Sequence, residues 1–280
     1  MYNHIIYNIE DKFPVDKEFN TIYTNRVRQG RDFLANKKVL ALSIIRNISN
    51  EYRYTLKVLK DLLSYCHTDS HVCIYENDSI DLTPNLVQEH IVKYDGYQNF
   101  HIVSESLNTP YLPLSKSKVR TENLANARNK CLAFGHSILP NPDFYLVIDL
   151  DFLNLSIHGI LNSFGWLGLN PSISGICGNS YIDFSSSNRE VFQNYDSFAF
   201  RLNYWDYREP IWFAYFNLPI GSPPIPVNSG FGGSCIYRYG YYGGLYGGED
   251  CEHVVLHKNL KEKLQNFSLY YNPSQIMILK

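Results

Sequence analysis

The sequence predicts an α/β protein with a mixed, mainly parallel sheet flanked by helices. Short β-rich apolar runs at 39–45, 71–76 and 144–148 alternate with stretches in which apolar residues recur at helical spacing. Polar or acidic residues follow each run directly, as they do where the carboxyl ends of parallel strands hold a ligand. A chain of 280 residues is also long enough to bury a large core within a single domain.

The first third of the chain gives the clearest elements. Residues 1–37 are polar and lack a clear period, so we expect an N-terminal arm that is either packed on the core or partly flexible. One domain, residues 38–280, should follow. Its first strand is predicted at Val39–Ile45, a helix at Tyr52–Tyr65 and a second strand at His71–Glu76.

The next elements repeat this alternation up to residue 151. The Asp, Thr and Pro at 81–84 are typical of a helix start. We expect a third strand at Phe100–Ser104, a helix over Glu122–Phe134 and a strand at Phe144–Ile148. A strand that is followed by a helix and another strand indicates parallel pairing.

The second half has a different texture. Over residues 152–235, Gly, Pro, Asn and aromatic residues interrupt the chain, so only short strands between loops are expected. The segment Gly243–Lys263 should form a Gly-rich turn followed by a helix.

Charge and composition exclude some partners. Lys and Arg number 25 and Asp and Glu 27, so the net charge of −2 predicts neither nucleic-acid binding nor attraction to an anionic membrane. No signal-peptide pattern and no apolar run of membrane-spanning length occurs, which favours a soluble, cytoplasmic protein without a membrane anchor. The six cysteines are scattered without metal-like spacing and are interpreted as reduced thiols.

The strongest chemical signal is the pair of carboxylates Asp149 and Asp151 directly after the Phe144–Ile148 run. Oxygen ligands at a sheet edge suit Mn²⁺ or Mg²⁺ shared with phosphate oxygens. Such a cation neutralises a diphosphate leaving group. Carboxylates after strands also cap turns, so this reading depends on the context of the pair.

Three motifs in order supply that context: NDSIDLT at 77–83, NLANARNKCLAF at 123–134 and FYLVIDLDF at 144–152. This order resembles the Rossmann-like GT-A glycosyltransferases, especially the family-two-like group with its NDGSTDGT, NxGxxxARN and DxD motifs. Ser79 and Leu82 stand where those enzymes more often have glycine. The resemblance implies a nucleotide-sugar-binding half at 38–151 and an acceptor-binding half at 152–280.

The same resemblance assigns roles to individual residues. Asp78 would accept from the base of a uridine nucleotide, and Arg128 would lie near the diphosphate or the sugar. Asp149 would be close to the ribose, with Asp151 as the metal ligand proper. Arg46, at the end of the first strand, is a candidate contact of the base or ribose. The alternatives are turn and cap roles for Asp78 and a helix-surface cation for Arg128.

A second motif, GGED at 247–250, resembles inverting galactosyl- and N-acetylgalactosaminyltransferases. By that resemblance Asp250 is the general base and Glu249 binds the acceptor. The alternative is that these acids only complement the dipole of a helix start. If residues 249–260 are helical, Glu249, His253 and His257 share one face, and either histidine could complete the metal shell.

The acceptor side is predicted from composition. A Gly-rich loop at 228–234 would let backbone amides approach a ligand closely. Aromatic residues gather over 195–215, where most are core and some could stack on a sugar. Asp196 and Arg201 are either contacts to acceptor hydroxyls or a surface ion pair. The predicted acceptor contacts are Trp205, Trp212, Gly232, Gly233 and Glu249.

We therefore expect metal-dependent, inverting transfer of a sugar from a UDP-sugar to an oligosaccharide or glycoprotein glycan. The texture also resembles soluble glycosyltransferases of bacteria and of large algal viruses, which would allow a viral xylosyltransferase that uses UDP-xylose in the host cytoplasm. Two other classes stay open. A sugar-nucleotide nucleotidyltransferase would need a basic, Gly-rich phosphate loop near the first strand, and a non-catalytic carbohydrate-binding protein would leave the paired carboxylates unexplained.

Overall fold

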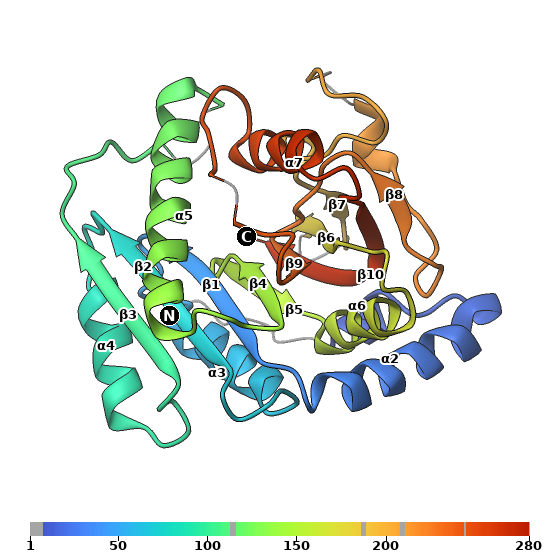
Figure 1. Cartoon of the computed structure of the whole chain (residues 1–280), viewed down its shortest axis with the longest axis horizontal. Helices are drawn as coiled ribbons and strands as arrows, with labels where there is room; N and C mark the ends of the chain where they lie inside the picture. Colours follow the sequence, from blue (N-terminus) through green and yellow to red (C-terminus); the bar gives the residue numbers. More distant parts are fainter. Residues whose placement is uncertain (1–7, 113–115, 186–188, 208–210, 244, 280) are drawn as a thin grey trace.

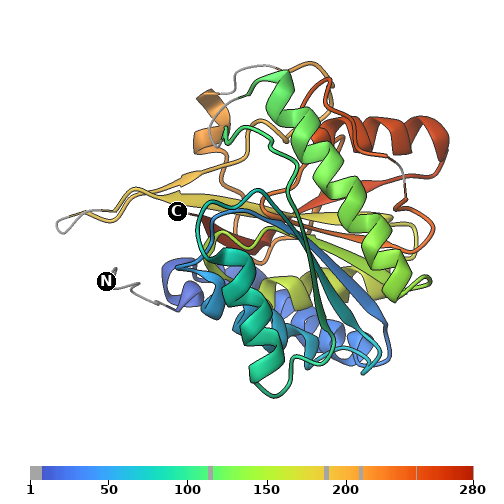
Figure 2. The same ribbon diagram turned by 90° about the vertical axis from the view of Figure 1, so that its left-hand side faces the viewer.

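The computed structural model describes residues 8–112, 116–185, 189–207, 211–243 and 245–279. These residues form one sheet between two layers of helices (Figure 1). Figure 2, viewed along the sheet, shows the two helical layers on opposite sides of it.

The sheet has a parallel half and a mixed half. Strands β1 (Val39–Ile45), β2 (His71–Asn77), β3 (Phe100–Glu105) and β4 (Phe144–Ile148) are parallel in the order β3-β2-β1-β4. The order continues with β9 (Ser234–Arg238), β6 (Gly175–Asp183), β10 (Leu269–Leu279) and β5 (Phe152–Leu155). The short strands β7 (Phe192–Asn194) and β8 (Ile225–Val227) pair with β6 and β10. Antiparallel β9 thus joins the two halves beside β4.

The helices cover the two faces unequally. One face carries α2 (Asn20–Leu34), α3 (Tyr52–Leu63), α4 (Thr83–Lys93) and α6 (Ile157–Leu169). The other carries α5 (Lys118–Ile138) and α7 (Glu252–Lys263). The remaining short helices are α1 (Ile9–Lys12), η1 (Lys17–Phe19) and η2 (Ile211–Tyr215).

Strand alternation explains the two cores. In β4, Phe144, Leu146 and Ile148 belong to the cluster with α2, α3 and α6, whereas Tyr145 and Val147 belong to the cluster with α5 and α7. Successive side chains of a strand point to opposite faces, so a wholly apolar strand must be covered on both. This is why each short apolar run of the sequence became a central strand.

The predicted elements up to β4 are confirmed, with β1 and β4 at the expected bounds. The prediction of only short strands over 152–235 is wrong, because α6 has 13 residues and β6 has 9. The polar segment before residue 37 contains the 15-residue helix α2, which packs along α6.

Small residues let these two helices approach closely. A Cβ atom on Gly30 of α2 would lie 1.7 Å from the Leu161 carbonyl oxygen, and one on Gly165 of α6 would lie 2.1 Å from that of Arg26. Glycine is the residue that allows such backbone contact. The glycines that indicated loops in the sequence therefore lie within a helix pair.

Two global features complete the fold. All six cysteines are free thiols, and Cys66 is the one that is only partly buried. Across the described ranges, no helix combines the length and the apolar character that crossing a membrane requires.

Candidate active site

A pocket of about 430 Å³ opens at the carboxyl ends of the parallel strands. Arg46 follows β1 and Asp149 follows β4, and both line the pocket. The other walls come from the loop at 109–112, one face of α5, the segment 194–198 and the start of α7. Ligands of open α/β sheets bind at this edge, so the pocket is the candidate active site.

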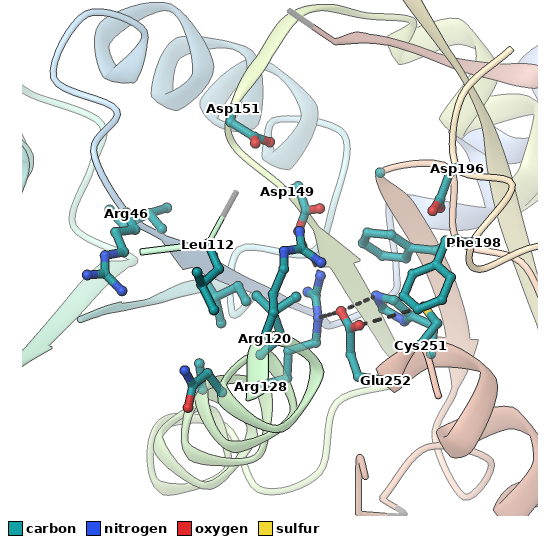
Figure 3. A pocket seen from close by; sticks show the side chains of 18 of the residues that line it. Arg46, Leu112, Arg120, Arg128, Asp149, Asp151, Asp196, Phe198, Cys251 and Glu252 are labelled. Carbon is teal, nitrogen blue, oxygen red and sulfur yellow. Dashed lines mark hydrogen bonds and ion pairs between the residues drawn. The ribbon is translucent and has the colours of Figure 1, made fainter. Parts of the chain in front are cut away.

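One face of α5 forms a continuous wall of the pocket. Ser117 caps the helix, and its hydroxyl accepts from the Arg120 backbone N–H at 3.4 Å. Pocket residues then recur at intervals of three and four, which is one face of a helix. Figure 3 shows Arg120 and Arg128 reaching from this helix towards Asp149. The α5 residues that line the pocket are Arg120, Asn123, Leu124, Ala127 and Arg128.

Arg128 connects two carboxylates at the base of the pocket. Its Nη2 lies 3.1 Å from Asp149 Oδ1, and its Nε lies 3.0 Å from Glu252 Oε1. Burial opposes the charge of Arg128, but the two carboxylates raise its pKa well above the usual value. The alternative of a helix-surface cation is therefore wrong for Arg128, which is 5% exposed.

Burial and Arg128 have opposite effects on the charge of Asp149. Burial raises the pKa of Asp149 to about 6, against the lowering effect of Arg128. Its backbone N–H donates to the Gly233 carbonyl at 2.9 Å, which holds the end of β4 against β9. Asp151 also lines the pocket, and its side chain is exposed there. Two carboxylates thus stand together at the strand end (Figure 3).

The carboxylates at the strand end fit a hard divalent cation only if a bound ligand supplies further oxygen atoms. In the described ranges, no cluster of three or more His, Cys, Asp and Glu side chains is arranged to hold a metal. Mg²⁺ sites at phosphates usually combine one or two carboxylates with phosphate oxygens and water. Asp149 and Asp151 match that pattern, so the residues fit a cation shared with a diphosphate.

The two histidines of α7 have different surroundings. His253 lines the pocket and stacks on Phe231, with 3.7 Å between the ring centroids. Both its ring nitrogens are buried without a hydrogen-bond partner among the described residues. Burial, with Arg128 nearby, holds the pKa of His253 well below its usual value. Nε2 lies 3.5 Å from Glu252 Oε1, and a neutral imidazole without a hydrogen-bond partner is compatible with a metal or phosphate contact.

His257 lies deeper, and the prediction of a metal-ligand role for it is not supported. Its Nδ1 lies 2.9 Å from Ser229 Oγ, and its Nε2 lies 2.7 Å from the Tyr237 hydroxyl. Burial lowers the pKa of His257 to about 3. With both nitrogens already hydrogen-bonded in the core, His257 has none left for a cation.

Asp78 does not line the pocket. Its carboxylate accepts from the backbone N–H groups of Leu107, Asn108 and Thr109 at 2.7, 2.8 and 3.0 Å. Partial burial would raise its pKa, but these and further hydrogen bonds hold the pKa of Asp78 well below the usual range. The carboxylate therefore shapes the loop at 107–109, which corresponds to the turn role that the sequence left open.

Arg46 lines the pocket beside that loop. Its Nη2 donates to the Thr109 carbonyl at 3.0 Å, and its guanidinium lies 5.2 Å from the centre of the Tyr111 ring. Asn77, next to Asp78, also lines the pocket and donates to Thr109 Oγ1 at 3.2 Å. These residues build the end of the pocket away from α7.

The predicted general base Asp250 and the predicted acceptor ligand Glu249 do not line the pocket. Glu249 is exposed and precedes α7, so it does not share a helical face with the histidines. Asp250 accepts from Arg201 Nη2 at 2.9 and 3.2 Å. Arg201 is fully buried, so the alternative of a surface ion pair between Asp196 and Arg201 is wrong.

The other predicted acceptor contacts have structural surroundings. Trp205 packs on the core beside α7, and Trp212 joins a cluster with Phe200 and Phe216; neither lines the pocket. Gly233 lines it, and a Cβ atom there would meet Met277 Sδ at 2.1 Å. Gly232 does not line the pocket, but its backbone N–H donates to Asp196 Oδ2.

Sequence reasoning missed several residues of the pocket. No motif of the sequence assigned a role to Glu252, although it pairs with Arg128 across 124 positions of sequence. Arg120 carried a usable signal, since it lies eight residues before Arg128 on the same helical face. Asp196 was a possible acceptor contact, but no spacing in the sequence could have placed it in the same pocket as Asp149.

Comparison with known proteins gave matches in structure only. No protein-family model matches the sequence, and no curated protein matches it either. A mannosyltransferase from Pyrobaculum calidifontis, solved with GDP-Man and Mn²⁺, is similar with a TM-score of 0.54 and 11% identity. That match covers 93% of this chain and 65% of the mannosyltransferase, so this chain spans less than two thirds of its length.

Two further solved structures are similar to this chain in fold. GalNAc-T7, solved with UDP, GalNAc and Mn²⁺, matches with a TM-score of 0.51 and 8% identity, over 87% of this chain and 44% of that one. Glucosyl-3-phosphoglycerate synthase from Mycobacterium tuberculosis, solved with Mn²⁺, UDP and phosphoglyceric acid, matches with a TM-score of 0.50 and 10% identity, over 90% and 73%. The fold is GT-A. The predicted fold class is therefore confirmed, and the activity has to be argued from the site.

Proposed function

We propose that this protein is a metal-dependent glycosyltransferase that moves a sugar from a nucleotide diphosphate donor, a UDP-sugar, to a hydroxyl of a glycan. The observation that carries the proposal is the juxtaposition of Asp149 and Asp151 with two arginines of α5 in a single pocket at the carboxyl ends of the strands. Carboxylates beside arginines suit a cation and a diphosphate bound side by side.

The donor would lie along the pocket from the end of β1 to the start of α7. Arg46, Asn77 and Tyr111 would surround the nucleoside, in the half of the chain at 38–151. Asp78 would act indirectly here, because it holds the loop that carries Thr109. The half at 152–280 would supply the acceptor side.

The diphosphate would lie between the carboxylates and α5. Asp149, Asp151 and His253 would hold a divalent cation, Mn²⁺ or Mg²⁺, and that cation would supply charge neutralisation for the leaving group. Arg120 would donate to phosphate oxygens from the opposite wall. Arg128, buried between Asp149 and Glu252, would keep Asp149 ionised and oriented.

Transfer would proceed with inversion, because a single carboxylate base suffices for direct displacement. The acceptor oxygen would attack the anomeric carbon from the face opposite the diphosphate. Sequence resemblance assigned the base to Asp250, whose carboxylate accepts two hydrogen bonds from Arg201. The neighbouring structures hold UDP in two cases and GDP-Man in one, which supports a nucleotide diphosphate ligand without fixing the sugar.

A donor panel tests this proposal. Purified protein would be incubated with UDP-xylose, UDP-glucose, UDP-galactose and GDP-mannose, a panel of p-nitrophenyl glycosides as acceptors, and either Mn²⁺ or EDTA. We expect nucleoside diphosphate release with at least one UDP-sugar, and its loss in EDTA. Pyrophosphate release instead would support a nucleotidyltransferase. Binding of glycosides with no donor binding would support a carbohydrate-binding protein.

The chemistry of the carboxylate pair gives a matched test within the chain. Asp151→Asn should lower turnover by about 100-fold or more, since a metal ligand and its charge are lost together. Asp95→Asn, the same change on an exposed residue after α4, should leave turnover unchanged. Equal rates for the two variants would contradict the assignment of Asp151.

A further inference from the structure

The pocket contains a carboxylate that no motif of the sequence assigns. Among the described residues, its acidic side chains are Asp149, Asp151, Asp196 and Glu252. Asp149 and Glu252 are both held by Arg128, at 3.1 and 3.0 Å. Asp151 stands at the strand end where a cation would bind. Asp196 differs from Asp149 and Glu252, because within the described ranges no ion pair engages it.

Asp196 is held in place by the backbone. The Gly232 N–H donates to its Oδ2 at 2.8 Å. Its own φ is 72°, a left-handed conformation that Asp and Asn tolerate better than other non-glycine residues. Figure 3 shows the Asp196 carboxylate at the α7 end of the pocket, away from Arg46. That end is the one left for an acceptor once the nucleoside occupies the other.

Asp250 has contacts that suit a different role. Arg201 holds its carboxylate with two hydrogen bonds, and the same guanidinium donates through Nη1 to the Phe198 carbonyl at 3.0 Å. These hydrogen bonds hold the Asp250 carboxylate on Arg201, and Asp250 does not line the pocket. Asp250 is thus connected through Arg201 to the segment that carries Asp196.

We propose that Asp196 is the general base of the transfer and that Asp250 is a positioning residue that acts through Arg201. This inference rests on the proposed glycosyl transfer. The acceptor hydroxyl gives its proton to the Asp196 carboxylate while its oxygen bonds to the anomeric carbon. The bond from that carbon to the diphosphate breaks, and its electron pair leaves with the nucleoside diphosphate.

The charge environment of Asp196 agrees with this role. Burial first, and then the carboxylates of Glu252 and Asp149, raise the pKa of Asp196 to about 7, while the Gly232 N–H lowers it. A base with a pKa close to the working pH combines a useful ionised fraction with a strong pull on the proton.

Matched variants test the assignment. Asp196→Asn keeps a residue that tolerates the left-handed backbone and removes the proton acceptor. We expect about a 100-fold or greater loss of kcat, with the thermal shift produced by UDP and Mn²⁺ unchanged. For Asp196→Ala, added formate should restore part of the rate by acting as an external base. Asp250→Ala should lose rate without formate rescue, because its role is to hold Arg201.

The outcomes separate this inference from the proposed function. Transfer by Asp196→Asn within a few-fold of wild type would overturn the inference. So would rescue of Asp250→Ala rather than Asp196→Ala by formate, or no rescue of either variant. If the wild-type protein shows neither a UDP and Mn²⁺ shift nor transfer from any donor of the panel, the proposed function itself fails.

Discussion

At the scale of single residues, Arg128 governs the charge balance of the pocket. It is the common partner of Asp149 and Glu252, and its side chain and that of Glu252 are each 5% exposed. Arg128→Met should therefore destabilise the protein by about 3–5 kcal/mol, because it leaves buried carboxylates without their cation. Urea unfolding at pH 7 measures this. A loss below 1 kcal/mol would contradict the buried pairing.

Arg120 should behave differently, although it lies on the same helical face. Its guanidinium reaches the pocket, where we propose that it meets phosphate oxygens. Arg120→Met should weaken UDP binding about 10- to 100-fold, as expected for a lost hydrogen bond to a charged group. Stability should change little, which makes this variant the control for Arg128→Met. Undiminished UDP affinity would place the diphosphate elsewhere.

The lowered pKa of His257 should make the free energy of unfolding depend on pH. Its native pKa of about 3 lies below the value of 6.5 for a free side chain, so the unfolded chain binds the extra proton first. The contribution to stability is complete above pH 6.5 and is lost as the pH falls towards 3. His257→Gln should flatten the pH dependence between pH 6 and 4 by up to about 1.4 kcal/mol per pH unit. If the free energy of unfolding, measured with urea, changes with pH equally in wild type and His257→Gln, this prediction is contradicted.

At the scale of elements, the contact between α2 and α6 depends on glycine. A Cβ atom on Gly165 would meet the backbone of Arg26, whereas one on Gly168 of the same helix would meet the ring of Phe33 at 3.1 Å. Gly165→Ala should therefore cost about 1–3 kcal/mol by overpacking, even though alanine favours a helix. Gly168→Ala should cost less, since a side chain can move. Thermal unfolding of both variants tests the difference, and equal midpoints would contradict it.

Helices α2 and α6 are also the elements that the sequence pattern did not predict. The strands up to β4 were predictable because apolar runs alternated with helical spacing and ended in polar residues. Helix α6 is apolar around most of its circumference and contains three glycines, so it has no polar face to indicate a helix. Helix α2 gains its order from packing on α6, which its polar sequence does not reveal.

At the scale of the whole molecule, the candidate site combines parts that only the fold brings together. The order of motifs located Asp149, Asp151 and Arg128 because all three lie within the predicted strand and helix pattern. Asp196 and Glu252 reach the pocket from the second half of the chain. That half joins the first where β9 pairs antiparallel with β4. Hydrogen bonds of Asp78 and Asp250 likewise depend on distant loops, so their roles could not be assigned from spacing.

The central claim is that Asp149 and Asp151 hold a divalent cation together with the donor diphosphate. The most direct measurement is the calorimetric affinity of UDP with Mn²⁺ and with EDTA, for wild type, Asp151→Asn and Asp95→Asn. We expect Mn²⁺ to tighten UDP binding at least about tenfold in wild type and Asp95→Asn, and to have no effect in Asp151→Asn. UDP affinity that is independent of Mn²⁺ in wild type, or equally enhanced in Asp151→Asn, would contradict the account.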